Sequence, residues 1–379
     1  MTSPRDVRSG PTQAALPLIP PLPRCFPGKL QDLDPESARL VLQVERLLLE
    51  YAEPDLAHSG VLAAVSGGTD SLALLLILTL LRERLQFRLK ACHLNHGLRP
   101  AAAAEQVWVA DFCSRLGVEF HGRVVDVAAL AAQKRMGLEE AGRDARLAMF
   151  RELTAPAGGF VATGHTLNDL AEDVLMRLLR GSGWPALAGM DRFNAESGIW
   201  RPLLFIERRE LAAFLERLNI PHLEDESNQM PDFLRNRLRL ESVPLLLREN
   251  PGWLDQVRSL KRLAETDAAY WRAEMEKHPL LVFAPGKAEG APAGHDSARR
   301  TVFLGREHLH NAPQALRLRL FMRCARALGG GQALADNLLA LDRAWSGDGA
   351  GPRGGKVIQL PGKTAARTTR DGIWFYFQR

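Results

Sequence analysis

The sequence has few cysteines and no long apolar run, and these absences exclude several classes of protein. Its 379 residues contain four cysteines, which lie far apart and form no Cys-Xaa-Xaa-Cys pair. This usage excludes a disulfide framework and a thiol relay and, since no signal peptide is recognisable, predicts a reduced protein of the cytoplasm. The longest apolar run, Leu72–Leu81, contains Thr79 and stops at Arg82. It is too short to span a bilayer, so we exclude a membrane protein.

Opposite charges are nearly balanced, and no internal repeat is evident. Lysine and arginine number 49 against 44 for aspartate and glutamate, and the sequence pI is about 9.2. So small an excess is compatible with a polyanionic partner where the basic residues cluster, but does not prove one. The length exceeds what one hydrophobic core usually organises and fits two or three domains.

The most informative segment joins an apolar strand, Val61–Val65, to an apolar helix through the loop Ser66-Gly67-Gly68-Thr69-Asp70-Ser71. The helix start offers unpaired N–H groups and a positive dipole end to a phosphate, and glycine lets the backbone come close. The loop lacks the Gly-Lys-Ser/Thr ending of the usual mononucleotide cradle and carries Asp70 instead. A carboxylate serves a phosphate only through a metal, so the loop predicts Mg-ATP that is attacked at the α-phosphate and releases pyrophosphate. The alternative is a glycine-rich turn without a ligand.

Strand and helix patterns alternate from Gly60 onward. The predicted strands are Val61–Val65, Leu89–His93, Glu119–Val125 and Phe160–Thr163. The predicted helices are Leu72–Leu85, Ala101–Leu116, Glu139–Ala155 and Asn168–Gly181, after an amphipathic helix at Leu40–Tyr51. This alternation predicts an α/β fold with a parallel sheet that is covered on both faces. Because ligands of such sheets bind beyond the carboxyl ends of the strands, we expect the loops at Ser66, His93 and Gly164 to converge.

The two ends of the chain differ from this middle part. The first thirty or so residues are rich in proline and predict an extended or disordered lead-in. Past Pro202 helices dominate, and a small mixed α/β domain follows a Gly/Pro/Ala-rich linker. The predicted elements there are helices Glu207–Leu218, Phe233–Arg248, Trp253–Lys277, Pro313–Leu328 and Ala335–Trp345, the linker Pro285–Asp296, a glycine-rich loop at residues 347–355, and strands Val357–Leu360 and Ile373–Phe377.

Two loops carry histidine and arginine side chains at the expected site. Cys92, His93 and His96 could suggest a metal site, but three ligands so crowded along a strand cannot face one point. Polar contacts to the nucleotide or docking of a chain terminus are favoured. Arg143 and Arg146 lie early in a helix, against its dipole, which suggests anion contacts, with a solvated helix face as the alternative.

The segment after Gly164 places Asp169 and Glu172 on one helix face, where they could hold Mg²⁺ or orient an amine. The alternative is ordinary capping by Asn168 with acidic residues in the first turn. At the end of that helix, Arg177 and Arg180 either complement the dipole or contact phosphate.

Three arginines follow a run of acidic and polar residues. Within Arg235-Asn236-Arg237-Leu238-Arg239, positions 235 and 239 share a helix face and 237 turns away. Three arginines in five residues exceed what solubility needs, and a solvated face is the alternative.

The motifs described above, taken in chain order over residues 58–250, resemble those of the tRNA(Ile)-lysidine synthases, a family of the PP-loop ATP pyrophosphatase superfamily. The matching segments are Ser66–Ser71, His93–Arg99, Glu139–Arg146, Gly164–Gly183, Arg201–Leu203, and residues 225–228 with Arg235–Arg239. The resemblance implies a parallel five-stranded Rossmann-like domain, a helical region and a small mixed α/β C-terminal domain. It implies that the C2 carbonyl of the wobble cytidine, in an isoleucine tRNA with a CAU anticodon, is adenylated with ATP and Mg²⁺. Free L-lysine would then displace AMP and form lysidine.

The resemblance also divides the chain and assigns residues. Residues 1–35 would be a flexible extension, 36–245 the catalytic domain, 246–284 a connecting or tRNA-binding region, and 297–379 a tRNA-recognition domain. The implied catalytic residues are Asp70, Arg143, Asp169, Glu172 and Arg239, with Asp70 as a magnesium ligand. The implied ATP-binding residues are Ser66, Gly67, Gly68, Thr69, Asp70, Ser71, His93 and His165. The implied tRNA-binding residues are Arg177, Arg180, Arg235, Arg237, Arg317 and Arg319, within a basic C-terminal part that also holds Arg299, Arg300, Arg306, Arg323 and Arg326.

This sequence departs from the family pattern next to Asp169. Many members have two adjacent aspartates followed by glutamine, where this chain has Asn168 before Asp169 and Leu170 after it. The missing first aspartate puts a two-aspartate metal model in doubt. Two rival functions stay open: a PP-loop tRNA thiolase, against which the scattered cysteines argue, and a nucleotide-binding module without tRNA catalysis. A homodimer is also left open, because the sequence does not determine the oligomeric state.

Overall fold

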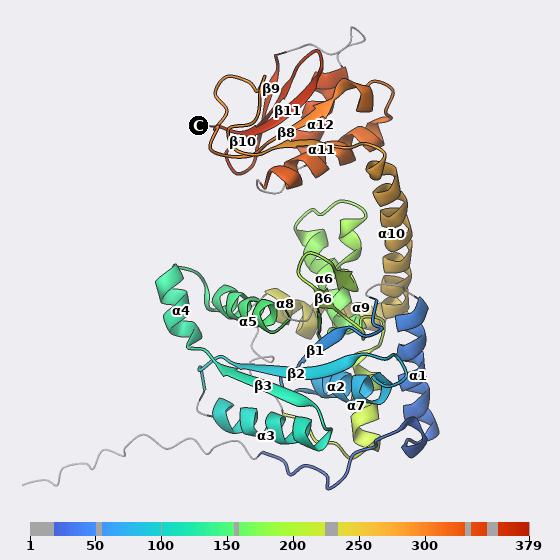
Figure 1. Ribbon diagram of the computed structural model, residues 1–379. Coiled ribbons are helices and arrows are strands. Elements are labelled where there is room, and N and C mark those ends of the chain that lie inside the picture. The colour runs from blue at the N-terminus through green and yellow to red at the C-terminus, as the bar shows by residue number, and fades with distance from the viewer. Residues whose placement is uncertain are drawn as a thin grey trace, which may run out of the picture. The chain divides into compact units, whose positions relative to one another are not determined.

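The computed structural model describes residues 19–50, 55–99, 101–154, 159–223, 234–329, 335–346 and 355–378 (Figure 1). The chain forms two compact units. The first comprises Met1–Ser182 and Ala186–Lys261, and the second comprises Gly183–Pro185 and Arg262–Arg379. No helix in the described ranges is long and apolar enough to cross a membrane.

The first unit is built on a six-stranded sheet of order β3-β2-β1-β4-β6-β5. Its strands are β1 Gly60–Ala64, β2 Arg88–Asn95, β3 Glu119–Val124, β4 Phe160–Ala162, β5 Phe193–Asn194 and β6 Ile199–Trp200. Five of them run parallel, and β5 pairs antiparallel with β6 at the edge. The expected parallel five-stranded sheet is therefore confirmed, with one short antiparallel strand added.

Helices cover both faces of this sheet (Figure 1). Val61 and Ala63 of β1 face a large core that includes α1 (Pro35–Glu50), α2 (Thr69–Leu81), α3 (Ala102–Arg115) and α7 (Arg208–Arg217). Leu62, between them, faces the opposite side and packs with Met149 of α5 (Leu138–Thr154). This alternation follows from the period of two along a strand. Helix α2 is almost wholly apolar after its first turn and is therefore buried on all sides from Ser71 to Leu81. Its buried position holds the loop that precedes it.

Two elements of the first unit differ from the sequence-based expectation. A short helix, α4 (Val127–Lys134), follows β3 and was not predicted. The expected single helix Phe233–Arg248 is observed from Leu234 as α8 (Leu234–Arg237), a π-helical turn η5 (Leu238–Ser242) and α9 (Val243–Glu249). Pro244 has no N–H and its ring clashes with the carbonyl one turn earlier, so a regular α-helix cannot run through it.

Part of the expected flexible lead-in packs against the first unit. The Trp108 indole N–H donates to the Pro20 carbonyl at 2.7 Å, and Arg115 donates to the Pro23 carbonyl at 2.8 Å. The rings of Phe26 and Phe112 meet edge to face, with centroids 5.0 Å apart. Backbone carbonyls and apolar side chains in residues 19–34 thus find partners on α3. The flexibility expected of residues 1–35 stays a prediction, and residues 1–18 lie outside the described residues.

In the first unit, α6 (Leu167–Leu179) follows β4 in the chain, and the boundary between the two units falls within α10 (Trp253–Glu276). The second unit has a five-stranded antiparallel sheet of order β7-β8-β11-β10-β9. Its strands are β7 Leu281–Phe283, β8 Thr301–Gly305, β9 Val357–Leu360, β10 Thr364–Thr368 and β11 Gly372–Phe377. The helices α11 (Gln314–Leu328) and α12 (Ala335–Ser346) cover one face, with Phe321 and Phe375 in the core between them.

The opposite face of this sheet is covered by the segment that the sequence predicted to be a linker. Ala288 and Ala291 pack with Trp374 and Tyr376, and His295 forms a β-bridge with Gln378. The segment Pro285–Asp296 has the glycine and proline content of a linker, but it packs on the sheet as part of the second unit. Two of the five strands there, β9 and β11, were expected from the sequence, and β7, β8 and β10 were not.

Candidate active site

The glycine-rich loop forms a small nest of N–H groups at the carboxyl end of β1. The backbone N–H groups of Ser66 and Gly67 donate to the Ser71 hydroxyl oxygen at 3.1 and 3.2 Å, and the Gly68 N–H donates to the Ser66 hydroxyl oxygen at 3.4 Å. Ser71 in turn donates to the Gly68 carbonyl at 2.9 Å. Donors that converge at a helix N-terminus suit a phosphate oxygen.

Close backbone approaches set the shape of this loop. Gly67 has φ +94°, and a Cβ there would lie 2.6 Å from a methyl group of Leu223, whose N–H donates to the Gly67 carbonyl at 2.9 Å. Gly164, in the loop after β4, lies so close to α2 that a Cβ would meet the Asp70 carbonyl oxygen at 3.1 Å. The predicted convergence of the loops at Ser66 and Gly164 is therefore observed.

Replacement of Gly67 by alanine should weaken ATP binding at least about fivefold, because both the positive φ and the contact with Leu223 oppose a Cβ, at a cost of about 1–3 kcal/mol. Titration of the variant with ATP, followed calorimetrically, measures the change. Gly183→Ala is the control, since no atom lies within 4 Å of the added Cβ. Equal ATP affinity of the two variants would contradict a nucleotide cradle at Gly67.

Three carboxylates and three arginines meet next to this loop. Arg208 Nε donates to Asp70 Oδ2 at 3.0 Å, and Arg208 Nη2 donates to Asp169 Oδ1 at 3.2 Å. Arg235 joins two acidic residues of α6, with distances of 2.8 Å to both Asp169 and Glu172. Arg239 donates to Glu172 Oε1 at 2.7 Å and to Asp169 Oδ1 at 3.3 Å.

Asp169 and Glu172 are buried, while the arginines stay partly exposed. The side chains of Asp169 and Glu172 are 8% and 2% exposed, against 35% for Arg235 and 23% for Arg239. The second oxygen of Asp169 accepts hydrogen bonds from the Thr166 N–H and hydroxyl at 2.8 and 2.7 Å, which also cap α6. The arginines therefore cover the carboxylates from the solvent side, so a cationic ligand has to exchange with them to reach Asp169 or Glu172.

Burial and charge act differently on the two aspartates. Burial raises the pKa of Asp70, as does Asp169, whereas Arg208 opposes the rise. Burial also disfavours ionised Asp169, but Arg208 and Arg235 outweigh it and lower the pKa of Asp169 to about 2. At neutral pH Asp169 is therefore an anion that is stabilised by its arginine partners.

Two histidines predicted to bind ATP have fixed surroundings. His93 is buried, and its Nδ1 donates to the Val65 carbonyl at 2.8 Å, because a carbonyl can only accept. This bond ties β2 to the base of the glycine-rich loop. Burial, together with the charges of Arg201, Arg235 and Arg146 and against the influence of Asp169, lowers the pKa of His165 to about 4. His165 is therefore neutral at physiological pH, and its Nδ1 lies 2.8 Å from the Thr163 hydroxyl. Whether either histidine contacts ATP stays a prediction.

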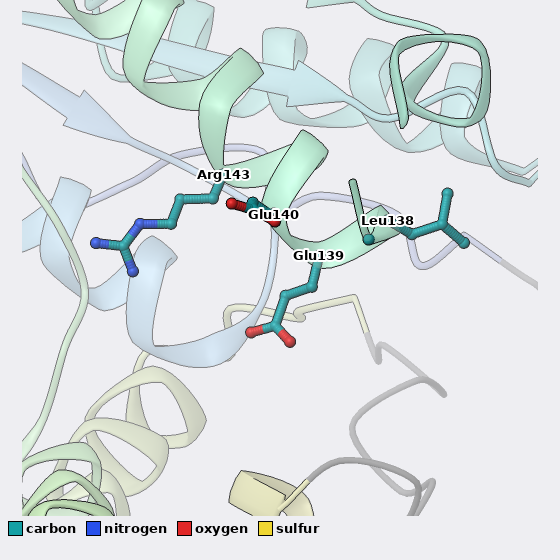
Figure 2. Close-up of a pocket in the computed structure, with 5 residues that line it drawn as sticks. Leu138, Glu139, Glu140 and Arg143 are labelled. Atoms are coloured by element: carbon teal, nitrogen blue, oxygen red, sulfur yellow. The ribbon is translucent and has the colours of Figure 1, made fainter. Parts of the chain in front are cut away.

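Arg143 extends from the start of α5 beside a shallow surface pocket, which it lines with Gly137, Leu138, Glu139 and Glu140 (Figure 2). Its side chain is exposed, and no carboxylate in the described part of the chain pairs with it. Burial lowers the pKa of both Arg146 and Arg201, and the charge of Arg143 contributes to both shifts, so Arg143 lies within electrostatic range of both guanidinium groups. This positive cluster agrees with the expected anion contacts.

The predicted tRNA-binding arginines lie in unlike settings. Arg235 belongs to the carboxylate cluster, whereas Arg237 and Arg180 are exposed. Arg177 is held by Asp173 at 2.8 Å and by the Ala186 carbonyl. In the second unit, Arg317 pairs with buried Asp342, and the Arg319 guanidinium stacks over Trp271 at 3.8 Å from the ring centroid. The acidic motif at residues 225–228 lies outside the described residues.

The site has a carboxylate oxygen that fits a divalent cation. Asp70 Oδ1 is buried and has no hydrogen-bond donor within the described part of the chain. No group of three or more histidine, cysteine, aspartate or glutamate side chains in the described ranges could hold a metal ion alone. Mg²⁺ is commonly bound by one or two carboxylates together with substrate phosphates and water, so a single carboxylate beside a phosphate nest fits it.

Arg208 was missed by the sequence analysis. It lies at the first position of α7, where a positive charge opposes the helix dipole, and this unfavourable placement was the available signal. Asn168, which replaces the aspartate usual in the family, accepts a hydrogen bond from the Arg208 N–H at 2.9 Å. The amide therefore caps α7, which is a structural use for the residue that departs from the family pattern.

Comparison with known proteins agrees with this architecture. A family model described as the PP-loop domain, an ATP-binding domain, matches residues 40–246, so the first unit is a PP-loop domain. The solved structure of the U34-tRNA thiolase NcsA from Methanococcus maripaludis is similar, with a TM-score of 0.50 and 19% identity over 61% of this chain and 80% of that chain. At this identity the likeness shows the fold alone.

The sequence relatives define the family more narrowly. The tRNA(Ile)-lysidine synthase of Nitratidesulfovibrio vulgaris (Hildenborough) is 46% identical over 320 residues, which is 82% of this chain and 90% of the relative. The synthases of Geobacter sulfurreducens and Enterococcus faecalis are each 38% identical over 75% and 53% of this chain. The chain belongs to the tRNA(Ile)-lysidine synthase family. It spans 58% of the Geobacter relative and 44% of the Enterococcus relative.

Proposed function

We propose that this chain is an ATP-dependent ligase that joins lysine to C2 of the wobble cytidine in an isoleucine tRNA with a CAU anticodon. The observation that carries this function is the arrangement of Asp70, Asp169 and Glu172 under three arginines beside the phosphate nest. Family membership supports the choice of reaction, because the relatives are named tRNA(Ile)-lysidine synthases. All substrates are cytoplasmic molecules, so we place the reaction in the cytoplasm.

In the first step, the C2 oxygen of the cytidine attacks the α-phosphate of ATP, the bond to the β-phosphate breaks, and pyrophosphate leaves. The N–H groups of residues 66–68 hold phosphate oxygens, and Arg143 with Arg146 offsets negative charge near them. Asp70 would hold Mg²⁺, and the ion would supply charge neutralisation for the departing pyrophosphate.

In the second step, the lysine ε-amine attacks C2, and AMP leaves with the former C2 oxygen. Asp169 and Glu172 attract the lysine ammonium by exchanging it for arginine. A carboxylate whose pKa is about 2 binds a cation well but is a weak base. We therefore assign Asp169 to orienting the lysine side chain, with Arg239 compensating charge on the adenylate.

Incubation of the protein with ATP, Mg²⁺, radiolabelled lysine and the CAU isoleucine tRNA tests this function. We expect label in the tRNA, with one pyrophosphate and one AMP released for each lysine joined. Tight ATP binding without label would favour a nucleotide-binding module, and sulfur transfer to the tRNA would favour a thiolase. The same reaction with lysine omitted should still release pyrophosphate, which separates the two steps.

Arg317 and Arg326 of α11 should respond differently to alanine. Arg317 donates to buried Asp342 at 2.6 Å, so Arg317→Ala leaves this carboxylate without a cation and with Gln314 as its side-chain donor. Loss of the buried ion pair should destabilise the second unit by about 3–5 kcal/mol. Arg326 is exposed and has no ion pair in the described residues, so Arg326→Ala should leave the melting temperature unchanged. If Arg326 contacts a phosphate, the slope of log tRNA affinity against log salt concentration should fall by about one.

Calorimetry and filter binding at several salt concentrations measure the two effects. A stable Arg317→Ala protein with weakened tRNA binding would instead assign Arg317 to the tRNA interface, as the sequence predicted.

A further inference from the structure

Arg208 is shared between two different loops of the site. Its Nε contacts Asp70, which starts α2 in the glycine-rich loop, and its Nη2 contacts Asp169 in the first turn of α6. The proposed function assigns Asp70 to the nucleotide and Asp169 to lysine. One guanidinium therefore connects the two substrate positions. Arg208 is 138 residues from Asp70 in the sequence and 39 residues from Asp169.

The backbone of Arg208 is fixed, whereas its guanidinium can exchange partners. The Arg208 N–H donates to Asn168 Oδ1 at 2.9 Å, and Leu211 and Phe214 bury α7 in the main core. The Arg208 side chain is 32% exposed, and it ends on the less buried carboxylate, Asp70, whose side chain is 21% exposed. Rotation of the side chain alone can thus move the guanidinium without rearranging the helix.

Charge decides which partner the guanidinium prefers. Without ligands, the cluster has three carboxylates, Asp70, Asp169 and Glu172, and three guanidinium groups. A divalent cation bound by Asp70 takes over the charge of that carboxylate, and a polyphosphate next to it is a stronger attractor for Arg208. Arg208 then shares less of its charge with Asp169, which becomes a better acceptor for an ammonium group.

We propose that Arg208 is a positioning residue that couples nucleotide binding at Asp70 to lysine binding at Asp169 and Glu172. This coupling rests on the proposed function, because that function assigns the two ligands. Linkage requires reciprocity, so lysine strengthens nucleotide binding by the same factor. The enzyme thereby exposes its lysine site when the nucleotide that activates the tRNA is in place.

Lysine affinity with and without nucleotide measures the coupling directly. Equilibrium dialysis of radiolabelled lysine would be run on the full chain without tRNA, in the presence or absence of Mg²⁺ and α,β-methylene-ATP, which cannot release pyrophosphate. For the native protein we expect lysine to bind at least about fivefold more tightly with the nucleotide analogue, the lower end of usual coupling. The reverse titration, nucleotide with and without lysine, should give the same factor.

Arg208→Lys separates coupling from charge. Lysine keeps the positive charge but lacks the planar fork that joins two carboxylates, so the variant should fold normally and its coupling factor should fall below about twofold. The matched control is Arg209→Lys, since Arg209 is the next residue, is 82% exposed and pairs only with Glu207 among the described residues. Its coupling factor should equal that of the native protein. A merely structural Arg208 would change the melting temperature or both lysine affinities together and leave their ratio intact.

A native protein without coupling, or an Arg208→Lys variant that keeps the native factor, would overturn the assignment. Lysine transfer to tRNA, measured on the same preparations, distinguishes this failure from failure of the proposed function. Transfer without coupling would refute the role of Arg208 alone. Coupling that Arg208→Lys abolishes, in a protein that does not modify tRNA, would refute only the proposed reaction. Absence of lysine binding under both conditions would overturn the role of Arg208, and absence of lysine transfer as well would refute the proposed function.

Discussion

Asp70→Asn should reduce ATP-dependent pyrophosphate release on the tRNA by at least about 100-fold while the protein stays folded. The substitution keeps the size of the side chain and removes the charge that would hold Mg²⁺. It also replaces one oxygen of a carboxylate that contacts Arg208 and has a buried, unpartnered Oδ1. Loss of one electrostatic contact to a developing charge typically costs 10²–10³ in rate. Stability should change little, because Asp70 is partly exposed and Arg208 keeps Asp169.

The measurement is pyrophosphate release under saturating lysine and tRNA, together with a melting curve. Asp111→Asn is the control, since Asp111 is an exposed carboxylate on α3 that pairs with Arg115 one turn away. Its turnover should match that of the native protein. Full activity of the Asp70→Asn variant would remove the glycine-rich loop from the chemistry.

Glu172→Ala should cause the largest loss of stability in the first unit. Glu172 is 1% exposed and receives donors from both Arg235 and Arg239, so its removal leaves two guanidinium groups with one shared carboxylate. Breaking a buried ion pair from one side costs about 3–5 kcal/mol. For a unit of this size, that cost corresponds to a fall of roughly 6–20 °C in its melting temperature.

Differential scanning calorimetry resolves the transition of the first unit from that of the second. Glu152→Ala is the matched control, because Glu152 makes an equally bidentate pair with Arg123 but is 62% exposed. An exposed pair contributes about 0–1 kcal/mol, so this variant should melt within a few degrees of the native protein. Similar melting temperatures for the two variants would show that the arginine cluster around Glu172 is not structural.

The central part of the site could be predicted because its signals are local. The glycine-rich loop between an apolar strand and an apolar helix specifies its own turn, and Asp169 and Glu172 share a helix face through their spacing. The pairing of Arg208 with Asp70 could not be predicted in this way, since the partners are 138 residues apart and meet only when α7 packs on α2. The same holds for Arg317 and Asp342, which depend on the packing of α11 against α12.

Composition gave wrong expectations for two segments of the second unit, because packing decides their structure. The segment Pro285–Asp296 has the composition of a linker, yet its small alanines fit against Trp374 and Tyr376 on the second sheet. Strand β10 has the sequence Thr-Ala-Ala-Arg-Thr, whose small and polar residues give no clear alternation, and it becomes a strand because β9 and β11 pair with it on both sides. Short side chains leave the register to the neighbouring strands.

The place of β1 at the centre of the first sheet has a consequence for the newly made chain on the ribosome. β1 pairs with β2, which follows closely in the chain, whereas its other neighbour β4 and the helix α7 that covers the apolar part of α2 are synthesised later. At roughly 5–20 residues per second, β4 follows β1 by on the order of 10 s. During that interval an unpaired strand edge and a fully apolar helix are open to other nascent chains. We therefore expect the glycine-rich loop between them to acquire its final shape late, and chaperones that shield apolar segments to raise the yield of folded protein.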